Sequence, residues 1–420
     1  SVHRQRLGGN RSVRCRHCQA VLTMTVIDLG VTPRANSYLN AEALRLPEQR
    51  FPLRVLVCGQ CWLVQTEDFL RSDELFEEDY PYFSGYSSTW IDHCREYSER
   101  MIDRFSLDST SSVVEVAVND GALLRFFHDS GMRCTGIEPT LATAEVARGL
   151  GLPVLTEFLT YDLAVQLRRR GPGADLLVAN NVLAHVPDID DFVLACAALL
   201  ADDGVATFEF QHLYELLVGC QFDTVYHEHY SYLSLVAVEA VFAGSELEVF
   251  DVDRLSTHGG SLRVYAQRSD TGTNVALPAV SEVRRLESDA GLKTPDAYRM
   301  LQGQADRIRD ELRVFLEEAR SAGRSVAAYG AAAKGNTLLN YAGIGSDLIE
   351  FVADRNPAKQ GKYLPGSHIE IVPEGRLASA RPDYVLVLPW NLLPEVEDQL
   401  SYVKEWSGAL VTAVPELRVW

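Results

Sequence analysis

The segment YHEHYSYLS at 226–234 concentrates groups that can take up or release a proton. It holds two of the ten histidines of the chain, His227 and His229, with Tyr226 and Glu228 beside them. Histidine is the usual general base near neutral pH, a neighbouring carboxylate can fix its tautomer, and a tyrosine hydroxyl can donate to a developing oxyanion. The pattern indicates either acid–base catalysis or a satisfied structural network. A His-x-His metal site is a weaker interpretation, because a third clear ligand is missing.

A second chemical pattern lies near the N-terminus, where four of the eight cysteines form two C-x-x-C pairs. Each pair can give two thiolates to one tetrahedral metal, so we predict a structural zinc site with a small β-structured insert between the pairs. A redox pair is the alternative. The predicted zinc ligands are Cys15, Cys18, Cys58 and Cys61. The remaining cysteines are expected to be small buried apolar side chains; they are Cys94, Cys134, Cys196 and Cys220.

Acidic and amide side chains follow several predicted strands of the central region. EVAVNDG ends an apolar run at a glycine turn, where backbone N–H groups can face a ligand, and Glu138 ends the next strand, where a carboxylate can accept hydrogen bonds from ribose hydroxyls. Because G-x-G-x-x-G is absent, the pattern favours S-adenosylmethionine over NAD; a solvated acidic residue at a strand end is the alternative. His185 follows Asn180 and Asn181 at the end of a further strand, so it should lie near a bound cofactor. The predicted cofactor-binding residues are Glu115, Ala117, Asn119, Gly121, Glu138, Asn180 and Asn181.

Two further turns are candidates for holding a substrate. THGGSLRVY at 257–265 places two glycines where backbone can approach a ligand, and YGAAAKGNT at 329–337 is a strand-to-helix turn with a lysine, suited to a nucleotide diphosphate. An ordinary Ala-rich helix start is the alternative for the second turn. The predicted substrate-binding residues are His258, Gly259, Arg263, Gly330, Lys334 and Asn336.

The elements that position these groups alternate between strands and helices from residue 112 onward, which predicts an α/β fold with doubly wound, mainly parallel sheets. A charged helical stretch separates a central α/β domain from a smaller one that repeats the strand, turn and helix order. The predicted boundaries are 1–13 for a leader or disordered segment, 14–75 for the zinc-binding domain, 76–277 for the central domain, 278–322 for the helical connector and 323–420 for the C-terminal domain.

The charge of the chain limits its partners. Acidic residues outnumber basic ones, 58 against 39, and the net charge of -19 disfavours nucleic acid as the main partner. No apolar run reaches the roughly 18 residues that span a bilayer, so we expect no membrane partner and a cytoplasmic location.

Ten segments, in their order along the chain, resemble the sugar C-methyltransferases of antibiotic deoxysugar pathways; they are CRHC, CGQC, YPYFSGYSS, EVAVNDG, GIEP, NNVLAHVPD, FDTVYHEHYSYLS, THGGSLRVY, YGAAAKGNT and PDYVLVLPWN. The resemblance runs from Cys15 to the C-terminus. It implies a zinc module, a central class I (Rossmann-like) S-adenosylmethionine methyltransferase domain and a Rossmann-like domain that helps to hold the substrate. The implied substrate is a nucleotide-linked, typically dTDP-linked, 4-keto-6-deoxysugar that is methylated next to its ketone. We expect a monomer or a small homo-oligomer.

The resemblance also assigns roles to single residues. It implies that His229 is the general base with Tyr226 and Glu228 beside it, and that Tyr82 and His185 line the sugar pocket. The base would form an enolate, which hydrogen-bond donors would stabilise while its carbon takes the methyl group. The zinc would sit in a separate, structural module.

The chain departs from the family in two places. Ala117 stands where the family pattern has the first glycine of the cofactor turn, and its methyl group would crowd the methionine part of the cofactor. Phe83 and Tyr86 in the YPYFSGYSS segment are bulkier than the residues of the family pattern, which points to an unusual sugar. Three other functions stay open at this point. They are an NAD-dependent nucleotide-sugar oxidoreductase, a zinc-containing RNA or protein methyltransferase, and a non-catalytic binding protein on a degenerate methyltransferase fold.

Overall fold

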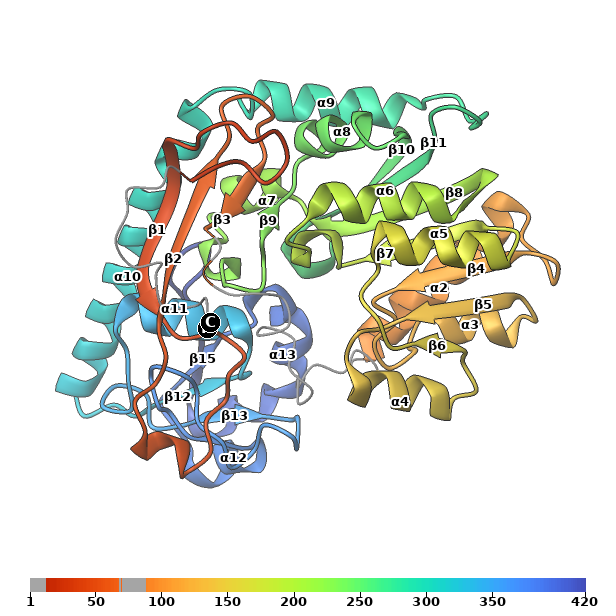
Figure 1. Cartoon of the computed structure of the whole chain (residues 1–420). Helices are drawn as coiled ribbons and strands as arrows, with labels where there is room; N and C mark the ends of the chain where they lie inside the picture. Colours follow the sequence, from red (N-terminus) through yellow and green to blue (C-terminus); the bar gives the residue numbers. More distant parts are fainter. Residues whose placement is uncertain (1–12, 68, 70–87) are drawn as a thin grey trace.

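The computed structural model describes residues 13–67, 69 and 88–420 and arranges them around three sheets (Figure 1). The smallest sheet is antiparallel and contains both strands of the predicted insert between the cysteine pairs. Its order is β1 (Met24–Thr32), β2 (Phe51–Val57), β3 (Val64–Thr66) and β9 (Ser231–Tyr232). The last strand belongs to the YHEHYSYLS segment. The N-terminal module that carries the four cysteines thus shares its sheet with that segment.

The central sheet is doubly wound, as the alternation of strands and helices predicts. Its strands β4 to β8 pair in parallel, and an antiparallel hairpin extends the β8 edge. The order is β10 (Leu247–Leu255), β11 (Ser261–Arg268), β8 (Leu200–Gln211), β7 (Ala174–Asn180), β4 (Ser112–Val116), β5 (Arg133–Ile137) and β6 (Val154–Leu155).

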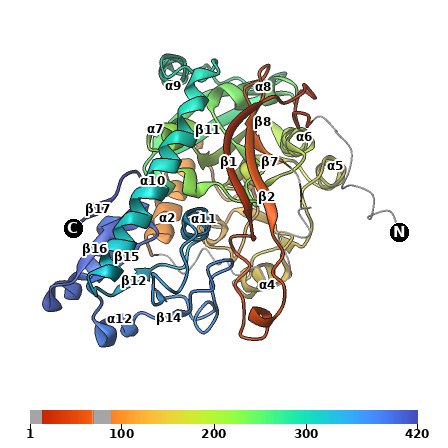
Figure 2. The same cartoon turned by 90° about the vertical axis from the view of Figure 1, so that its left-hand side faces the viewer.

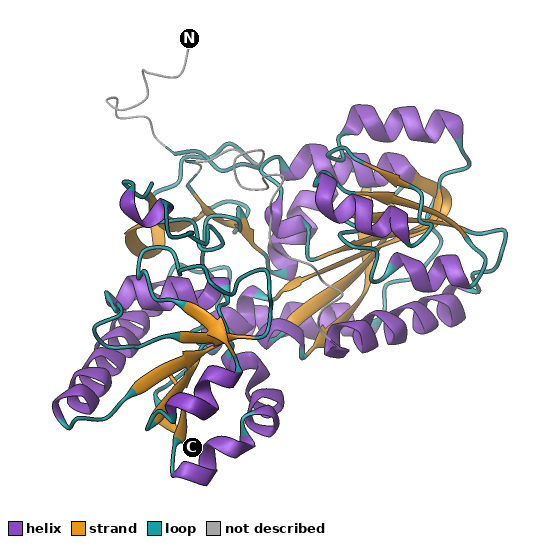
Figure 3. Ribbon diagram, turned by 90° about the horizontal axis from the view of Figure 1, so that it is seen from below, coloured by secondary structure: helices purple, strands orange, loops and turns teal. Residues whose placement is uncertain are grey.

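Helices cover both faces of this sheet (Figure 3). Alternate residues of β7 point to opposite faces, so Leu177 packs in one core cluster and Leu176 in the other. One face packs on α5 (Tyr161–Arg170), α6 (Ile189–Leu199) and α8 (Leu235–Ala243). The other packs on α2 (Ser88–Phe105), α3 (Leu124–Asp129) and α4 (Leu141–Gly149).

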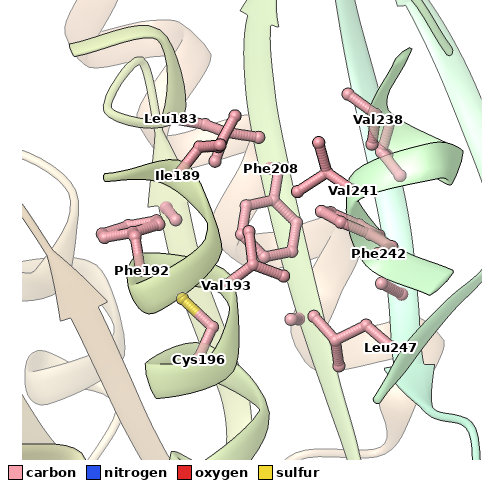
Figure 4. Packing of buried hydrophobic residues seen from close by; sticks show 14 of the residues in the cluster. Leu183, Ile189, Phe192, Val193, Cys196, Phe208, Val238, Val241, Phe242 and Leu247 are labelled. Atoms are coloured by element: carbon pink, nitrogen blue, oxygen red, sulfur yellow. The ribbon is translucent and has the colours of Figure 1, made fainter. Parts of the chain in front are cut away.

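Apolar packing between β8 and its helices fixes the strand that leads to the candidate site (Figure 4). Phe208 is fully buried and its ring lies 5.0 Å from the ring of Phe242 on α8, while Val193 and Cys196 of α6 belong to the same cluster. Full burial of each such apolar side chain contributes about 1.5–3 kcal/mol. All four cysteines outside the C-x-x-C pairs are buried, as predicted.

The five parallel strands of the C-terminal sheet have the same order as the five parallel strands of the central sheet, and the two sheets differ at the antiparallel edge. The order of the C-terminal sheet is β14 (Ile371–Pro373), β13 (Val352–Asp354), β12 (Val326–Tyr329), β15 (Tyr384–Val387), β16 (Ala409–Thr412) and β17 (Arg418–Val419). Its helices are α11 (Ala333–Ala342), α12 (Gly375–Ala380) and α13 (Leu393–Gln399). In such sheets ligands bind beyond the carboxyl ends of the strands, where the strand order reverses.

The stretch between the two α/β sheets is helical, as predicted, and consists of α9 (Pro278–Asp289) and α10 (Asp296–Ser321). Helix α10 runs beside β1 and beside α11, so it ties the zinc module to the C-terminal domain (Figure 2). A short helix, α7 (Leu213–Val218), follows β8. Among the described residues, no helix combines the length and the apolar character needed to cross a membrane.

Candidate active site

The two C-x-x-C pairs come together in one cluster. All four sulfur atoms lie within 4.8 Å of one another, and the Sγ atoms of Cys15 and Cys61 are 3.5 Å apart. Gln65 on β3 donates from Nε2 to Cys15 Sγ at 3.3 Å, a bond that suits a thiolate. Four converging sulfurs without disulfides are the donor set of a closed tetrahedral zinc site. The prediction of structural zinc fits this geometry.

The turn after β4 has an unusual backbone. Ala117, Asn119 and Gly121 all have positive φ, of 57°, 53° and 83°. Left-handed conformations cost a non-glycine residue about 1–2 kcal/mol, so Ala117 carries backbone strain at a position that would favour glycine. A Cβ on Gly121 would lie 2.5 Å from Leu152 Cδ1, so the Leu152 side chain would have to shift to admit one. The turn is built for close approach of backbone to a ligand.

Carboxylates from two neighbouring strands meet at this turn. Glu138 accepts hydrogen bonds from the backbone N–H groups of Asn119 and Thr140, both at 2.9 Å, which fixes it against the turn. Glu115 is 7% exposed, and burial raises its pKa well above the usual value, with the charges of Asp120 and Glu138 adding to the rise. Its Oε2 atom is buried and has no hydrogen-bond partner among the residues that the structure describes. An unsatisfied buried acceptor at the carboxyl end of a strand suits the amine and hydroxyl donors of S-adenosylmethionine.

The end of β7 adds two asparagines to the same edge. Asn180 Oδ1 is likewise buried and has no partner within the described part of the chain. Asn181 has a φ of 56° and donates its backbone N–H to the carbonyl of Glu209 at 2.6 Å. The seven predicted cofactor residues thus lie on the ends of β4, β5 and β7 or in the turns that follow. Their individual contacts with a cofactor stay a prediction.

Two histidines predicted for the sugar pocket lie side by side. The ring centroids of His185 and His229 are 4.7 Å apart, although 44 positions separate the two in sequence, and the ring centroid of Tyr226 lies 4.1 Å from that of His229. His229 Nδ1 donates to the carbonyl of Thr224 at 2.9 Å, and His185 Nδ1 donates to the carbonyl of Glu228 at 2.8 Å. Because a carbonyl only accepts, each neutral ring carries its proton on Nδ1 and keeps Nε2 as the basic nitrogen.

Burial keeps these imidazoles neutral. It lowers the pKa of His185, and it lowers the pKa of His229 to well below the usual value, with the charge of His185 adding to the effect. Burial also lowers the pKa of His258 to about 4. The histidines are therefore present as bases at neutral pH. His227 faces elsewhere, since its Nε2 donates to the carbonyl of Pro52 in the zinc module.

Glu228 is held by a residue that the sequence analysis missed. Both carboxylate oxygens accept hydrogen bonds from Asn36 Nδ2, at 2.8 and 2.7 Å. Asn36 lies in the loop after β1, 192 positions away. Nothing in its local sequence marks it as a partner of the segment at 226–234.

A second buried carboxylate, Glu209 at the end of β8, was also missed. Burial alone would raise its pKa, but a hydrogen bond from His93 and the charge of Arg263 lower it to about 2. Arg263 donates from Nη2 to Glu209 Oε2 at 2.8 Å, and its side chain is 3% exposed. The predicted contact of Arg263 with a diphosphate is untested, but this guanidinium already has a buried partner.

The C-terminal turn brings a lysine to the same region. Lys334 donates from Nζ to Asn391 at 2.6 Å and lies 4.8 Å from the ring centroid of Trp390. Burial lowers the pKa of His229, and the charge of Lys334 makes a small further contribution. Burial raises the pKa of Asp223 to about 6, against the opposing charge of Lys334 and a hydrogen bond from Trp390.

The other predicted substrate residues have structural contacts of their own. Gly330 has a φ of 85°, and a Cβ there would lie 2.5 Å from Pro389 Cδ. Asn336 is 1% exposed and donates to the carbonyl of Ala35 at 2.6 Å. His258 and Gly259 form a turn with φ of 54° and 86°, and a Cβ on Gly259 would lie 2.7 Å from the indole of Trp390.

The structure does not bring every predicted residue into view. Tyr82, Phe83 and Tyr86 lie outside the described residues.

The repeated topology of the two α/β sheets extends to the turns that follow their strands. Asp354 at the end of β13 accepts from the backbone N–H of Ala331 at 2.7 Å, as Glu138 does from Asn119.

Comparison with known proteins identifies the family. Residues 15–76 match a zinc binding domain, residues 90–252 a methyltransferase domain, and residues 256–415 a C-methyltransferase C-terminal domain. The chain is 35% identical over 405 residues to the C-methyltransferase NovU of Streptomyces niveus, which covers 96% of each chain. The chain belongs to the zinc-containing C-methyltransferase family. This C-methyltransferase uses S-adenosylmethionine and carries structural zinc, as the sequence predicted.

Solved structures align with part of the C-methyltransferase. A 1,6-didemethyltoxoflavin-N1-methyltransferase of Burkholderia thailandensis aligns over 50% of this chain and 96% of its own, with 16% identity and a TM-score of 0.37. The PH0226 protein of Pyrococcus horikoshii aligns over 46% of this chain and 99% of its own, with 13% identity and a TM-score of 0.38. The family membership rests on the three domain matches and on NovU, and it favours methyl transfer to carbon over the oxidoreductase and binding-protein alternatives.

Proposed function

We propose that this C-methyltransferase methylates the carbon next to the ketone of a nucleotide-linked, dTDP-type 4-keto-6-deoxysugar. The observation that carries the proposal is the state of His229. Its Nδ1 proton is held by the Thr224 carbonyl and burial keeps the ring neutral, so Nε2 is available to accept a proton. A carbon acid next to a ketone is a substrate that requires such a base.

The proposed reaction begins when His229 Nε2 takes the proton from the carbon next to the ketone. The electron pair of the broken C–H bond moves to the ketone oxygen and forms an enolate. The Tyr226 hydroxyl and the Lys334 ammonium would supply a donor and a positive charge to stabilise that oxygen. His185 would line the pocket without donating there, because its single ring proton is held by the Glu228 carbonyl.

S-adenosylmethionine, when bound, supplies a methyl group on a positively charged sulfur. The enolate carbon forms the new C–C bond to that methyl group while the C–S bond breaks, and the sulfur keeps the electron pair. Glu115, Glu138 and the turn at 117–121 would hold the donor at the carboxyl edge of the central sheet. The proton on His229 then returns to solvent.

The nucleotide end of the substrate is proposed to lie at the C-terminal sheet. The helix α11 begins directly after the Gly330 turn, and a helix N-terminus next to Lys334 suits a diphosphate. NovU is a C-methyltransferase, which agrees with this class of reaction.

Mass spectrometry of reaction products tests the proposal. The purified protein is incubated with S-adenosylmethionine and dTDP-4-keto-6-deoxysugars, with and without a 3-amino group, beside His229→Asn. We expect a product heavier by one methyl group from the native protein only. Intact binding of S-adenosylmethionine without methylation of any of these sugars would remove the proposed substrate class. Equal methylation by His229→Asn would remove the proposed base.

A further inference from the structure

A loop of the zinc module reaches the middle of the candidate active site. Asn36 Nδ2 lies 2.8 and 2.7 Å from the two carboxylate oxygens of Glu228, whose residue is only 3% exposed. Both oxygens lie on the same side of Nδ2, so the amide shares one N–H between them in a bifurcated hydrogen bond. A buried carboxylate needs such donors to stay charged and fixed.

The loop itself is fastened on both sides of Asn36. The carbonyl of Ala35 accepts from Asn336 Nδ2 at 2.6 Å, and the Tyr38 hydroxyl donates to the carbonyl of Ala331 at 2.6 Å. Both partners belong to the turn and helix that follow β12. The position of Asn36 is therefore set by neighbours that do not depend on Glu228.

The zinc module also holds the backbone of the base. Thr66 on β3 donates from its hydroxyl to the carbonyl of His229 at 3.0 Å and from its N–H to the carbonyl of Tyr230 at 3.1 Å. The strand pairing of β3 with β9 continues this contact, with Val64 opposite Tyr232. The side chain of Glu228 and the backbone of His229 are thus both attached to the module that carries the four cysteines.

We propose that Asn36 is a positioning residue of the active site and acts through Glu228. Glu228 is held both through its backbone and through its side chain. Its carbonyl accepts from His185 Nδ1, and its carboxylate is held by Asn36. Holding the Glu228 carboxylate in place also holds the Glu228 backbone. The carbonyl of that backbone orients His185, and the next residue in the chain is His229. The zinc module thereby completes the catalytic site of the central domain.

This inference rests on the proposed function of His229, and its expected size follows from positioning. A displacement of about 1 Å in a catalytic group can cost on the order of 100-fold in rate, and loss of a supporting hydrogen bond typically costs about 10- to 100-fold. We expect Asn36→Ala to lower kcat by about 10- to 100-fold. The affinity for S-adenosylmethionine should not change, because the ends of β4, β5 and β7 are untouched.

A matched control lies in the same loop. Asn40 is exposed and its side chain accepts only from the backbone N–H groups of Glu42 and Ala43 among its described contacts. Asn40→Ala removes the same carboxamide four positions away, and we expect kcat within about twofold of the native value, as for surface changes away from special features.

A double-mutant cycle distinguishes positioning from general damage. Asn36→Ala, Glu228→Gln and the double variant are compared with the native protein in kcat and in the free energy of unfolding. If Asn36 acts through Glu228, adding Asn36→Ala to Glu228→Gln lowers kcat by less than about threefold. Losses that multiply independently in kcat would overturn the inference.

The pH dependence of kcat in Asn36→Asp distinguishes a positioning role from a merely structural one. The substitution keeps the size of the side chain but places two carboxylates in contact, so one of them must bind a proton before the hydrogen bond can form. We expect part of the lost kcat to return as the pH is lowered, relative to Asn36→Ala. A pH profile parallel to that of Asn36→Ala contradicts the proposed contact.

The unfolding measurements separate the two possible failures. Coupling between Asn36 and Glu228 in unfolding needs no substrate, so its absence overturns the inference whatever the reaction is. If the coupling is present but the native protein methylates none of the tested ketosugars, the proposed function fails, and the catalytic role of Asn36 fails with it.

Discussion

Replacing Arg263 by methionine tests how the candidate site is held together. Arg263 on β11 stands directly opposite Glu209 on β8 in the antiparallel register, and their side chains are joined at 2.8 Å. The Arg263 side chain is 3% exposed and that of Glu209 is fully buried. The guanidinium also lies 4.6 Å from the ring centroid of Tyr97. Arg263→Met keeps much of the apolar volume and removes the charge.

The expected cost follows from leaving the buried carboxylate with fewer partners. Breaking a buried ion pair by removing one member typically costs about 3–5 kcal/mol of unfolding free energy. At about 2–4 °C per kcal/mol for a domain of this size, the melting temperature should fall by roughly 6–20 °C. Adding Glu209→Gln to Arg263→Met removes the uncompensated charge, so the double variant should regain part of the loss.

Denaturant and thermal unfolding measure this effect, with Arg254→Met as the control. Arg254 lies on the adjacent strand β10 and pairs with Glu215, but its side chain is 51% exposed, so its loss should cost less than about 1 kcal/mol. If Arg263→Met unfolds like the native protein and instead raises KM for the nucleotide sugar, the guanidinium serves the ligand, and the reasoning from the buried pair is refuted.

Three more outcomes follow from the geometry. Burial lowers the pKa of His229 and His185, so the unfolded chain binds more protons than the folded chain below about pH 6.5. The free energy of unfolding should therefore be retained above that pH and fall below it, and the fall should be less steep in His229→Asn. An unchanged slope in that variant contradicts the assignment. Gly121→Ala should cost about 1–2 kcal/mol for its left-handed backbone and a further ~1–3 kcal/mol for overpacking against Leu152, whereas Gly131→Ala, with a similar φ and open space around it, should show the first cost alone in denaturant unfolding. Chelation of the zinc should abolish methyl transfer, while calorimetry should still detect binding of S-adenosylmethionine. The reason is that β3 of the zinc module pairs with β9 and not with the strands that hold the cofactor turn. Methyl transfer that survives chelation contradicts this prediction.

The sequence predicts those parts of the site that depend on local spacing. The C-x-x-C pairs converge because each pair is a short turn, and their predicted zinc cluster is confirmed. Glu115 and Glu138 lie at strand ends because apolar runs stop there, and parallel strands bring such ends to one edge. The α/β class and the family follow from the same patterns.

The contacts that were missed join residues far apart in sequence. Strand β9 has only two residues, too short for a periodic signal, and its pairing with β3 spans more of the chain than any local pattern can encode. Asn36 and Glu228 are 192 positions apart. Arg263 was assigned to the substrate from its turn, because the insertion of β11 beside β8, which sets it opposite Glu209, cannot be read from one strand alone.

Exchange of the substrate proton with solvent tests the central claim most directly. The protein is loaded with S-adenosylhomocysteine, which cannot donate a methyl group, and mixed with a dTDP-4-keto-6-deoxysugar in deuterated water. If His229 is the base, the native protein incorporates deuterium next to the ketone and His229→Asn does not, while both bind the sugar. Equal incorporation by both proteins would contradict the account.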